Sequence, residues 1–372
     1  MKFSCLQENL YQGLNIVSRL AGTSRTSLPI LNNILLTTQK GFLKISSTNL
    51  EMAIETKIRA KIDEEGNITI PAQLLNNYIS LLPNEILNFD LDKDELIIKS
   101  EKQKTKIKGI SADDFPIIPQ IEKKEKFLID SKEFKSALEK TIFTISPSEI
   151  RAELSGALFS FNTPKQKKLT IVGTDSYRLA EKEIELKESN IKEEKNIIIP
   201  IKTLQEILKI IKNEGEVEIY LSESQILFIY QNTELISRII SGEYPNYKQT
   251  IPESYKTKII INKEEFLRSI KIASLFTKIG INDINLEFAV KNSQIIISSL
   301  NNQLGENKTI LNAEITGQNN EIVFNYRYLI DGLINLPDGE LILEVINDNT
   351  PGLIKSTGDP FYLYLIMPIK NN

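Results

Sequence analysis

Apolar residues recur along the chain in two alternating rhythms, one typical of amphipathic helices and one typical of strands. Between residues 131 and 145, Phe134, Leu138 and Ile142 stand at every fourth position, which predicts a helix with a single apolar face. Residues 263–276 show the same spacing. Strand-like runs follow each of these segments, so the pattern predicts helices that pack on sheet.

The same order of elements is predicted three times: a helix, several strands, a second helix and a further pair of strands. The expected first helices span residues 7–20, 131–145 and 263–276, with N-caps at Ser131 and Asn262. The strands that follow are expected at 30–36, 42–46 and 53–58, at 157–161, 169–172 and 179–184, and at 285–290, 294–298 and 309–315. The second helices are expected at 71–82, 200–212 and 326–336, each followed by strands such as 216–221 and 225–230.

The spacing of matching residues supports an internal threefold repeat. Thr48, Thr174 and Leu300 begin matching turns and lie 126 residues apart in each step. Polar linkers near residues 120–125 and 253–257 separate the repeats. The sequence therefore predicts an α+β protein of three repeated domains, at 1–121, 126–252 and 256–372, each with two helices packed on antiparallel sheet.

Composition narrows the chemistry that is available to this chain. Its 372 residues include no histidine and one cysteine, Cys5, so histidine-based catalysis, the usual histidine metal ligands and an internal disulfide are excluded. No glycine-rich phosphate loop, signal-peptide pattern or membrane-length apolar run is present in the sequence. We expect a cytoplasmic protein with no cofactor, no metal site and no membrane partner. Its net charge of −4 means that any affinity for DNA requires basic side chains gathered on one face.

One short stretch, residues 173–180, joins two predicted strands and contains Asp175. Taken alone, it is typical of a hairpin turn in which the aspartate bonds to nearby backbone amides. Its counterparts in the other two repeats change that interpretation, because turns on a rigid scaffold commonly carry function.

Several motifs in this order and at this spacing resemble the bacterial sliding clamps, the beta subunits of DNA polymerase III. The resemblance covers essentially the whole chain and is carried by Leu28–Pro29–Ile30–Leu31–Asn32–Asn33, Leu154–Ser155–Gly156–Ala157–Leu158, Thr174–Asp175–Ser176–Tyr177–Arg178–Leu179–Ala180, Tyr244–Pro245–Asn246–Tyr247 and Leu365–Ile366–Met367–Pro368–Ile369. It implies a head-to-tail homodimeric ring around duplex DNA. Such a ring acts as a non-catalytic processivity factor that tethers the replicative polymerase and other replication and repair proteins.

The resemblance also implies a hydrophobic cleft for short linear motifs of the polymerase alpha subunit, the clamp loader, other polymerases and repair proteins. The matching positions are Leu154, Thr174, Ser176, Tyr177, Arg178, Leu179, Pro245, Thr250, Pro351, Leu365, Ile366, Met367, Pro368 and Ile369. Ser176 and Tyr177 replace the family's frequent glycine and histidine, and Gln249 stands near a frequent arginine. These departures change the expected rim of the cleft and one polar contact.

Basic residues on the predicted helices are expected to face double-stranded DNA without reading its sequence. They are Arg25, Lys132, Lys135, Lys202, Lys209, Lys263, Arg268, Lys271 and Lys278. The family also places the dimer interface between the first domain of one copy and the third domain of the other. By position, Ile107 is then expected to meet Leu275 and Phe276.

Two other functional classes remain open from the residues alone. Asp113, Asp114 or Asp175 would provide acid–base groups for a carboxylate hydrolase, although no nucleophile or metal set accompanies them. A repeat scaffold that binds linear peptides without encircling DNA would share the fold and the cleft.

Overall fold

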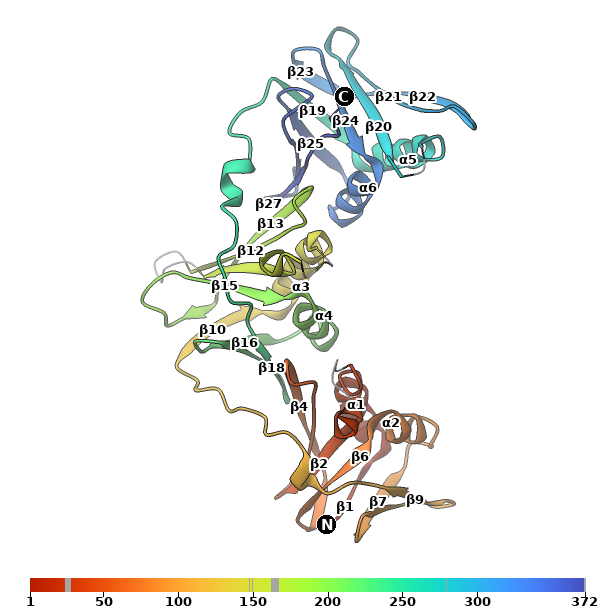
Figure 1. Ribbon diagram of the computed structural model, residues 1–372, viewed down its shortest axis with the longest axis vertical. Coiled ribbons are helices and arrows are strands. Elements are labelled where there is room, and N and C mark those ends of the chain that lie inside the picture. Colours follow the sequence, from red (N-terminus) through yellow and green to blue (C-terminus); the bar gives the residue numbers. More distant parts are fainter. Residues whose placement is uncertain (24–27, 147, 149, 162–166, 279, 371–372) are drawn as a thin grey trace. The chain divides into compact units, whose positions relative to one another are not determined.

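The computed structural model describes residues 1–23, 28–146, 148, 150–161, 167–278 and 280–370. Its helices and strands follow one another in the order drawn in Figure 1. The α-helices are α1 (Gln7–Val17), α2 (Ala72–Ser80), α3 (Ser131–Thr141), α4 (Ile201–Ile210), α5 (Lys263–Ser274) and α6 (Tyr326–Asn335).

Two compact units make up the chain, and each is described by itself. Unit 1 contains residues 1–132, 187–191 and 205–239, and unit 2 contains residues 133–186, 192–204 and 240–372. Both units combine antiparallel sheet with helices, so the predicted α+β class is confirmed.

Unit 1 contains a five-stranded and a nine-stranded sheet. The five-stranded sheet has the order β5 (Lys61–Glu64), β1 (Lys2–Leu6), β7 (Ile86–Asp92), β8 (Glu95–Lys99), β9 (Lys104–Lys108). The nine-stranded sheet has the order β14 (Glu188–Ser189), β10 (Glu125–Asp130), β16 (Glu216–Leu221), β17 (Gln225–Tyr230), β18 (Thr233–Arg238), β4 (Met52–Arg59), β3 (Phe42–Thr48), β2 (Asn33–Gln39), β6 (Gly66–Pro71).

Unit 2 contains a nine-stranded and a four-stranded sheet. The nine-stranded sheet has the order β15 (Lys195–Pro200), β11 (Gly156–Phe161), β12 (Lys168–Thr174), β13 (Arg178–Glu185), β27 (Asp359–Ile366), β26 (Gly352–Ser356), β25 (Glu340–Val345), β19 (Thr257–Asn262), β23 (Glu314–Gly317). The four-stranded sheet has the order β22 (Gly305–Asn312), β21 (Gln294–Asn301), β20 (Asp283–Ala289), β24 (Asn320–Asn325).

Each nine-stranded sheet is assembled from strands of two successive repeats. We call the pairing of β4 with β18 the first junction, where Thr56 lies opposite Thr233. We call the pairing of β13 with β27 the second junction, where Arg178 lies opposite Ile366. The two smaller sheets end in the edge strands β5 and β9 and in the edge strands β22 and β24. Of these, β9 and β22 match β18 and β4 of the first junction in the repeat, and among the described residues neither has such a partner within this chain.

The apolar stripes predicted from the sequence form the core. In unit 1, α1 packs against α2 and against β4, burying Leu10 and Leu14. In unit 2, α5 packs against α6, and Phe266 and Ile270 are fully buried in the shared core. Burial of each such side chain contributes about 2 kcal/mol, so the stripes position the helices on the sheets.

Local differences from the predicted elements have identifiable causes. Asn262 caps α5, because its side chain accepts a hydrogen bond from the Glu265 amide at 3.1 Å. The predicted cap Ser131 is wrong: Asp130 accepts from the Lys132 amide at 3.0 Å. The strand expected at 30–36 begins only at Asn33, because Pro29 starts a 3-10 turn.

Candidate functional site

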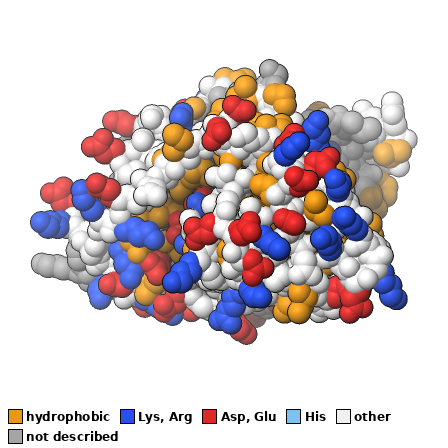
Figure 2. Space-filling view, turned by 90° about the horizontal axis from the view of Figure 1, so that it is seen from below, with side chains coloured by type: hydrophobic (Ala, Val, Ile, Leu, Met, Phe, Trp, Pro, Cys, Tyr) orange, Lys and Arg blue, Asp and Glu red, His pale blue; other side chains and the backbone are white. Residues whose placement is uncertain are grey.

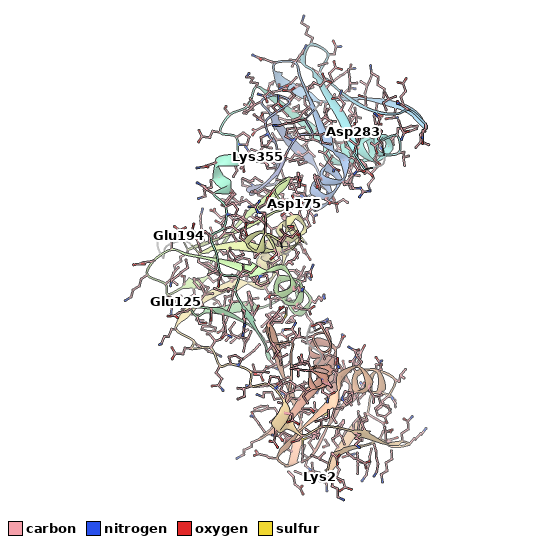
Figure 3. All side chains as sticks on the ribbon, in the orientation of Figure 1. Lys2, Glu125, Asp175, Glu194, Asp283 and Lys355 are labelled. Atoms are coloured by element: carbon pink, nitrogen blue, oxygen red, sulfur yellow. The ribbon has the colours of Figure 1, made fainter. Side chains whose placement is uncertain are left out.

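The turn before β13 has the hydrogen-bond pattern that the sequence suggested. The Asp175 carboxylate accepts from the amides of Tyr177 and Arg178, both at 2.9 Å, and the Thr174 hydroxyl donates to the Arg178 carbonyl at 2.7 Å. Figure 3 labels Asp175 in this turn. Ser176 has φ of 75°, a conformation that favours glycine, as does Leu50 in the matching turn of the first repeat.

Arg178 ties the turn to α6 and to the residues after α3. Its Nε contacts the second carboxylate oxygen of Asp175 at 3.1 Å, and one terminal nitrogen donates to the Phe143 carbonyl at 3.0 Å. The other terminal nitrogen pairs with Asp331, and the guanidinium lies 4.7 Å from the Tyr328 ring centre. Burial lowers the pKa of Arg178, but Asp331 and Asp175 raise it by more, so the pKa lies above its ordinary value and the side chain is a fixed cation. Each of its three nitrogens thus donates to a partner within the chain.

An apolar cluster lies at the second junction beside this turn. Its buried members are Leu158, Val172, Leu179, Tyr247, Leu353 and Leu365. The half-buried side chains of Tyr244, Ile251, Leu363 and Met367 pack against them. We call this set the second-junction cluster. Because these four side chains remain partly accessible, the cluster offers apolar contact area to an added chain.

Two tyrosines fix the segment that covers this cluster. The Tyr247 hydroxyl donates to Glu181 at 2.5 Å, and the Tyr244 hydroxyl donates to the Val172 carbonyl at 3.3 Å. Burial raises the pKa of both hydroxyls above their usual range, and for Tyr247 the neighbouring Glu181 adds to the rise. Both tyrosines therefore stay neutral donors at physiological pH.

The residues after β27 are held by backbone hydrogen bonds. The Met367 amide donates to the Tyr177 carbonyl at 2.8 Å, and the Ile369 amide donates to the Val323 carbonyl at 2.8 Å. Met367, Pro368 and Ile369 are half-buried as a result. Met367 is thus held at the border of the cluster.

Comparison with known proteins gives one consistent answer. Family models for the DNA polymerase III beta subunit match its N-terminal domain at residues 1–119, its central domain at 128–246 and its C-terminal domain at 248–370. The beta sliding clamp of Bacillus subtilis is 30% identical over 383 residues and covers 100% of both chains.

The chain belongs to the bacterial beta sliding clamps.

Other relatives agree with this assignment. The beta sliding clamp of Synechocystis is 28% identical, covering 100% of this chain and 99% of its own. The crystal structure of the Bacillus subtilis DNA polymerase sliding clamp has a TM-score of 0.94 at 29% identity, covering 100% of both chains. A putative DNA polymerase III beta subunit from Eubacterium rectale has a TM-score of 0.92 at 32% identity, also covering 100% of both chains.

The predicted cleft residues of this sliding clamp all belong to unit 2, and the structure brings several of them together. Leu179, Leu365 and Met367 belong to the second-junction cluster. Leu154 and Ile366 are buried, whereas Tyr177 is 61% exposed. Thr174 is also buried, and the remaining predicted positions are exposed or half-buried: Ser176, Arg178, Pro245, Thr250, Pro351, Pro368 and Ile369.

Some residues of this surface were missed by the sequence interpretation. Tyr247, Tyr244 and Leu353 contribute to the cluster although none of them was assigned to the cleft. The two tyrosines stood within a quoted motif, so their aromatic rings were a usable signal. Leu353 gave no such signal, because only strand pairing places it beside Leu365.

The residues expected to face DNA divide into three groups. Those exposed on the surface are Lys132, Lys202, Lys209, Arg268, Lys271 and Lys278, while Lys135 is half-buried. Lys263 contradicts its prediction: it is buried, and its ammonium group donates to the Leu336 carbonyl at 2.6 Å and to Asp338 at 2.9 Å. Arg25 lies outside the described residues.

The residues expected at the dimer interface also differ in accessibility. Leu275 is 69% exposed at the end of α5, and Phe276 is half-buried. Ile107 is only 4% exposed, because alternate residues of β9 face opposite ways and this one points into its own unit. Its side chain is therefore not available to a second copy, which corrects that part of the prediction.

The described residues also bear on the other functional classes. Asp113 and Asp114 form a 3-10 turn, and the Ser111 hydroxyl donates to Asp113 at 2.9 Å. Within the described ranges, no cluster of three or more acidic or cysteine side chains is arranged to hold a metal ion. No described helix has the length and apolar character to span a membrane.

Proposed function

We propose that two copies of this sliding clamp join head to tail into a ring that encircles duplex DNA and tethers a replicative polymerase. The observation that carries the proposal is the pattern of open edges. Both junctions join a five-stranded and a four-stranded set of strands into nine-stranded sheets, and one five-stranded and one four-stranded sheet remain unjoined. Pairing β9 of one copy with β22 of the other completes a third such sheet at each of two contacts.

The interface proposed between the copies uses the backbone edge of β9 rather than the Ile107 side chain. Lys104, Lys106 and Lys108 point away from the core along that edge, and charged edges prevent indiscriminate strand pairing. On the partner copy, Leu275 at the end of α5 and the 53% exposed Ile310 on β22 offer apolar contact area. We therefore expect the lysine-bearing edge of β9 to pair selectively with β22 of the other copy.

Light scattering tests the assembly. The particle in solution is expected to have twice the 42.3 kDa mass of one chain. The double variant Leu275→Ala, Phe276→Ala is expected to give folded monomers. Tyr255→Ala removes a similarly exposed aromatic residue elsewhere and serves as control. A double variant that stays dimeric at low concentration contradicts the proposed interface.

DNA binding is proposed to come from basic side chains and not from overall charge. On the face of the molecule drawn in Figure 2, acidic and basic side chains are interspersed, so this face has no uniform positive field. Arg268 and Lys271 are exposed on α5. Each phosphate neutralised contributes about 0.9 to the salt slope, so replacing both with glutamine is expected to reduce that slope by up to about 2 for every DNA sequence. A changed sequence preference contradicts the proposal.

The second-junction cluster is proposed to bind short linear motifs of the polymerase and other partners. Met367 supports this assignment, because a flexible thioether at the border accommodates different apolar side chains. Met367→Ala is expected to weaken binding of a polymerase-derived peptide about tenfold in a calorimetric titration while leaving the assembly dimeric. Unchanged affinity places the binding surface elsewhere.

Retention on circular DNA separates this proposal from a peptide-binding scaffold. A ring is expected to stay on a closed circle at high salt and to leave once the circle is cut, whereas a scaffold shows no such dependence. We further propose that the clamp acts in the cytoplasm, without a cofactor and without catalysis of its own.

A further inference from the structure

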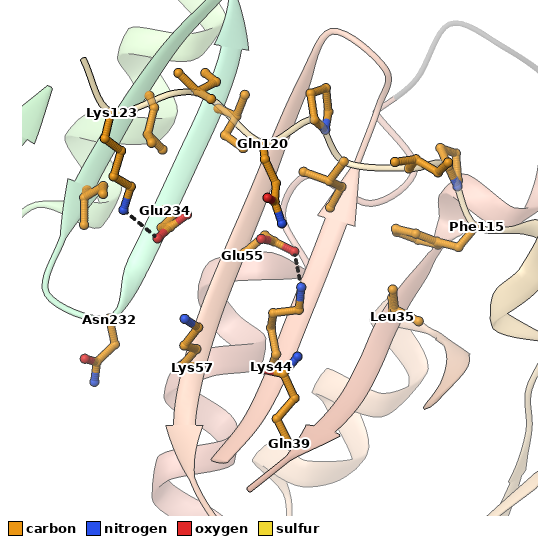
Figure 4. A pocket seen from close by; sticks show the side chains of 18 of the residues that line it. Leu35, Gln39, Lys44, Glu55, Lys57, Phe115, Gln120, Lys123, Asn232 and Glu234 are labelled. Carbon is orange, nitrogen blue, oxygen red and sulfur yellow. Dashed lines mark ion pairs between the residues drawn. The ribbon is translucent and has the colours of Figure 1, made fainter. Parts of the chain in front are cut away.

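A pocket of about 690 Å³ lies at the first junction, in unit 1. Its floor comes from β3, β4, β17 and β18, and its roof comes from the segment 115–123 that crosses these strands. Figure 4 shows Lys44, Glu55, Lys57 and Glu234 on the strands beneath Phe115, Gln120 and Lys123. The proposed binding of linear motifs does not use this pocket, because that binding is assigned to unit 2.

The second junction shows what is missing from this pocket. Glu55 on β4 and Glu181 on β13 occupy equivalent positions. They are 126 residues apart in sequence, and their strand-pairing partners, Ser46 and Val172, are also 126 residues apart. At the second junction Glu181 accepts the hydroxyl of Tyr247, three residues after Tyr244. At the first junction Ile118, three residues after Phe115, takes that place and lines the pocket instead. The second junction thus has a tyrosine hydroxyl that donates to the glutamate at this position, whereas at the first junction Ile118 occupies the matching position and Tyr220, the tyrosine packed nearby, donates to Glu218 instead.

The two junctions also differ in the charged residues that stand at equivalent positions. Lys57 lies directly opposite Lys44, whereas the equivalent Glu183 lies opposite Thr170. Like charges at directly opposed positions repel one another. Lys44 pairs with Glu55 at 3.0 Å, while Lys57 lies 5.3 Å from the centre of the Phe42 ring and forms no ion pair with a carboxylate among the described residues. The pocket therefore offers one cation to an incoming anion.

We propose that this pocket binds an extended segment of a partner protein that carries a tyrosine next to an acidic residue. The ring takes the volume that Tyr247 fills at the second junction, and its hydroxyl donates to Glu55. The neighbouring carboxylate pairs with Lys57 and relieves its repulsion with Lys44. Apolar contacts come from Leu35, Ile118 and Ile236, which line the pocket.

The proposal is tested on the full chain with the capped tetrapeptide acetyl-Gly-Tyr-Asp-Gly-amide as probe. Methyl groups of isoleucine and leucine are labelled, and their NMR shifts are followed during titration. Shifts at Ile118, Ile121 and Ile236 are expected, with a dissociation constant on the order of 1 mM for so small a ligand. Replacing the probe's aspartate with asparagine is expected to weaken binding at least about fivefold.

Two variants and one control decide between binding modes. Lys57→Glu is expected to weaken binding at least about tenfold, and Ile118→Tyr is expected to abolish it by filling the pocket. Lys93→Glu makes the same charge change at an exposed hairpin tip of the other sheet and is expected to leave binding unchanged. Because neither variant touches β9, β22 or the second-junction cluster, dimer formation and motif binding stay as independent readouts.

Three results overturn the proposal. The first is an absence of shifts at about 10 mM probe, well above the affinity expected. The second is a set of shifts at Leu179 and Leu365 in place of the first-junction methyls, which means that the probe binds the second-junction cluster. The third is equal affinity of the Lys57→Glu variant, which removes the assigned ion pair.

Discussion

The two junctions of this clamp have the same backbone and very different side chains. In both, the third strand of one repeat pairs antiparallel with the last strand of the next repeat. At the second junction, Asp359 accepts hydrogen bonds from Lys140 and Lys182, both at 2.6 Å. At the first junction, the pair Arg19–Glu206 is looser at 3.7 Å, and a pocket remains under the covering segment.

The difference teaches that strand pairing sets the topology while side chains set how tightly a junction is held. Backbone hydrogen bonds are equivalent at both junctions and are indifferent to sequence. The side chains of Asp359, Lys140 and Lys182 are only 11–18% exposed, so solvent screens their charges little. At the first junction, the basic side chains of Arg19 and Lys44 are more accessible, at 29% and 25%. We therefore expect unit 2 to keep its junction rigid and unit 1 to have room for a ligand.

The largest effect is expected from Asp359→Asn. This change leaves Lys140 and Lys182 partly buried without their shared partner, which costs about 3 kcal/mol of unfolding free energy. Urea denaturation followed by circular dichroism measures the loss, with the exposed Asp348→Asn in the same unit as control. A loss below about 1 kcal/mol removes the distinction between the junctions.

The same residue predicts a pH dependence. Burial raises the pKa of Asp359, but the hydrogen bonds from Lys140 and Lys182 outweigh it, so its folded pKa lies below the ordinary value of 3.8. A lowered carboxyl pKa stabilises the fold above the unfolded value and loses that effect as the pH falls through the folded value. The stability gap between the parent and Asp359→Asn is therefore expected to be complete at neutral pH and to shrink below pH 3.8.

An exchange of the covering residues gives an intermediate effect. Tyr247→Ile removes a buried ring and its bond to Glu181, and it is expected to cost about 2 kcal/mol. Ile118→Tyr fills existing space and is expected to change stability by less than about 1 kcal/mol in either direction. Denaturation of both variants measures the asymmetry. Equal losses mean that the pocket is not a ready space.

The smallest effect is expected from Arg19→Met at the first junction. The Arg19–Glu206 contact is 3.7 Å long, and Glu206 keeps a second partner in Lys209 at 2.7 Å, so removal of the arginine is expected to cost less than about 1 kcal/mol. Thermal unfolding measures this cost, and raised salt is expected to reduce the difference in stability between the parent and the Arg19→Met variant. A cost equal to that of Asp359→Asn contradicts the expected difference between the junctions.

Much of the architecture follows from the sequence alone. Repeating apolar stripes such as Phe134, Leu138 and Ile142 predicted the helices, because burial of one face is a local property of spacing. The regular distance between Thr48 and Thr174 predicted matching turns, and both turns show the same hydrogen bonds. The family followed from the order of short motifs.

Tertiary structure alone decided which side chains are available. Lys263 looked like a surface cation, yet it is buried against the end of α6, and Ile107 points into its own unit. Arg178 was expected to serve a ligand, yet Asp175, Asp331 and Phe143 take its donors. Local spacing determines elements, whereas burial, charge pairing and empty space depend on residues far apart in sequence that only strand pairing brings together.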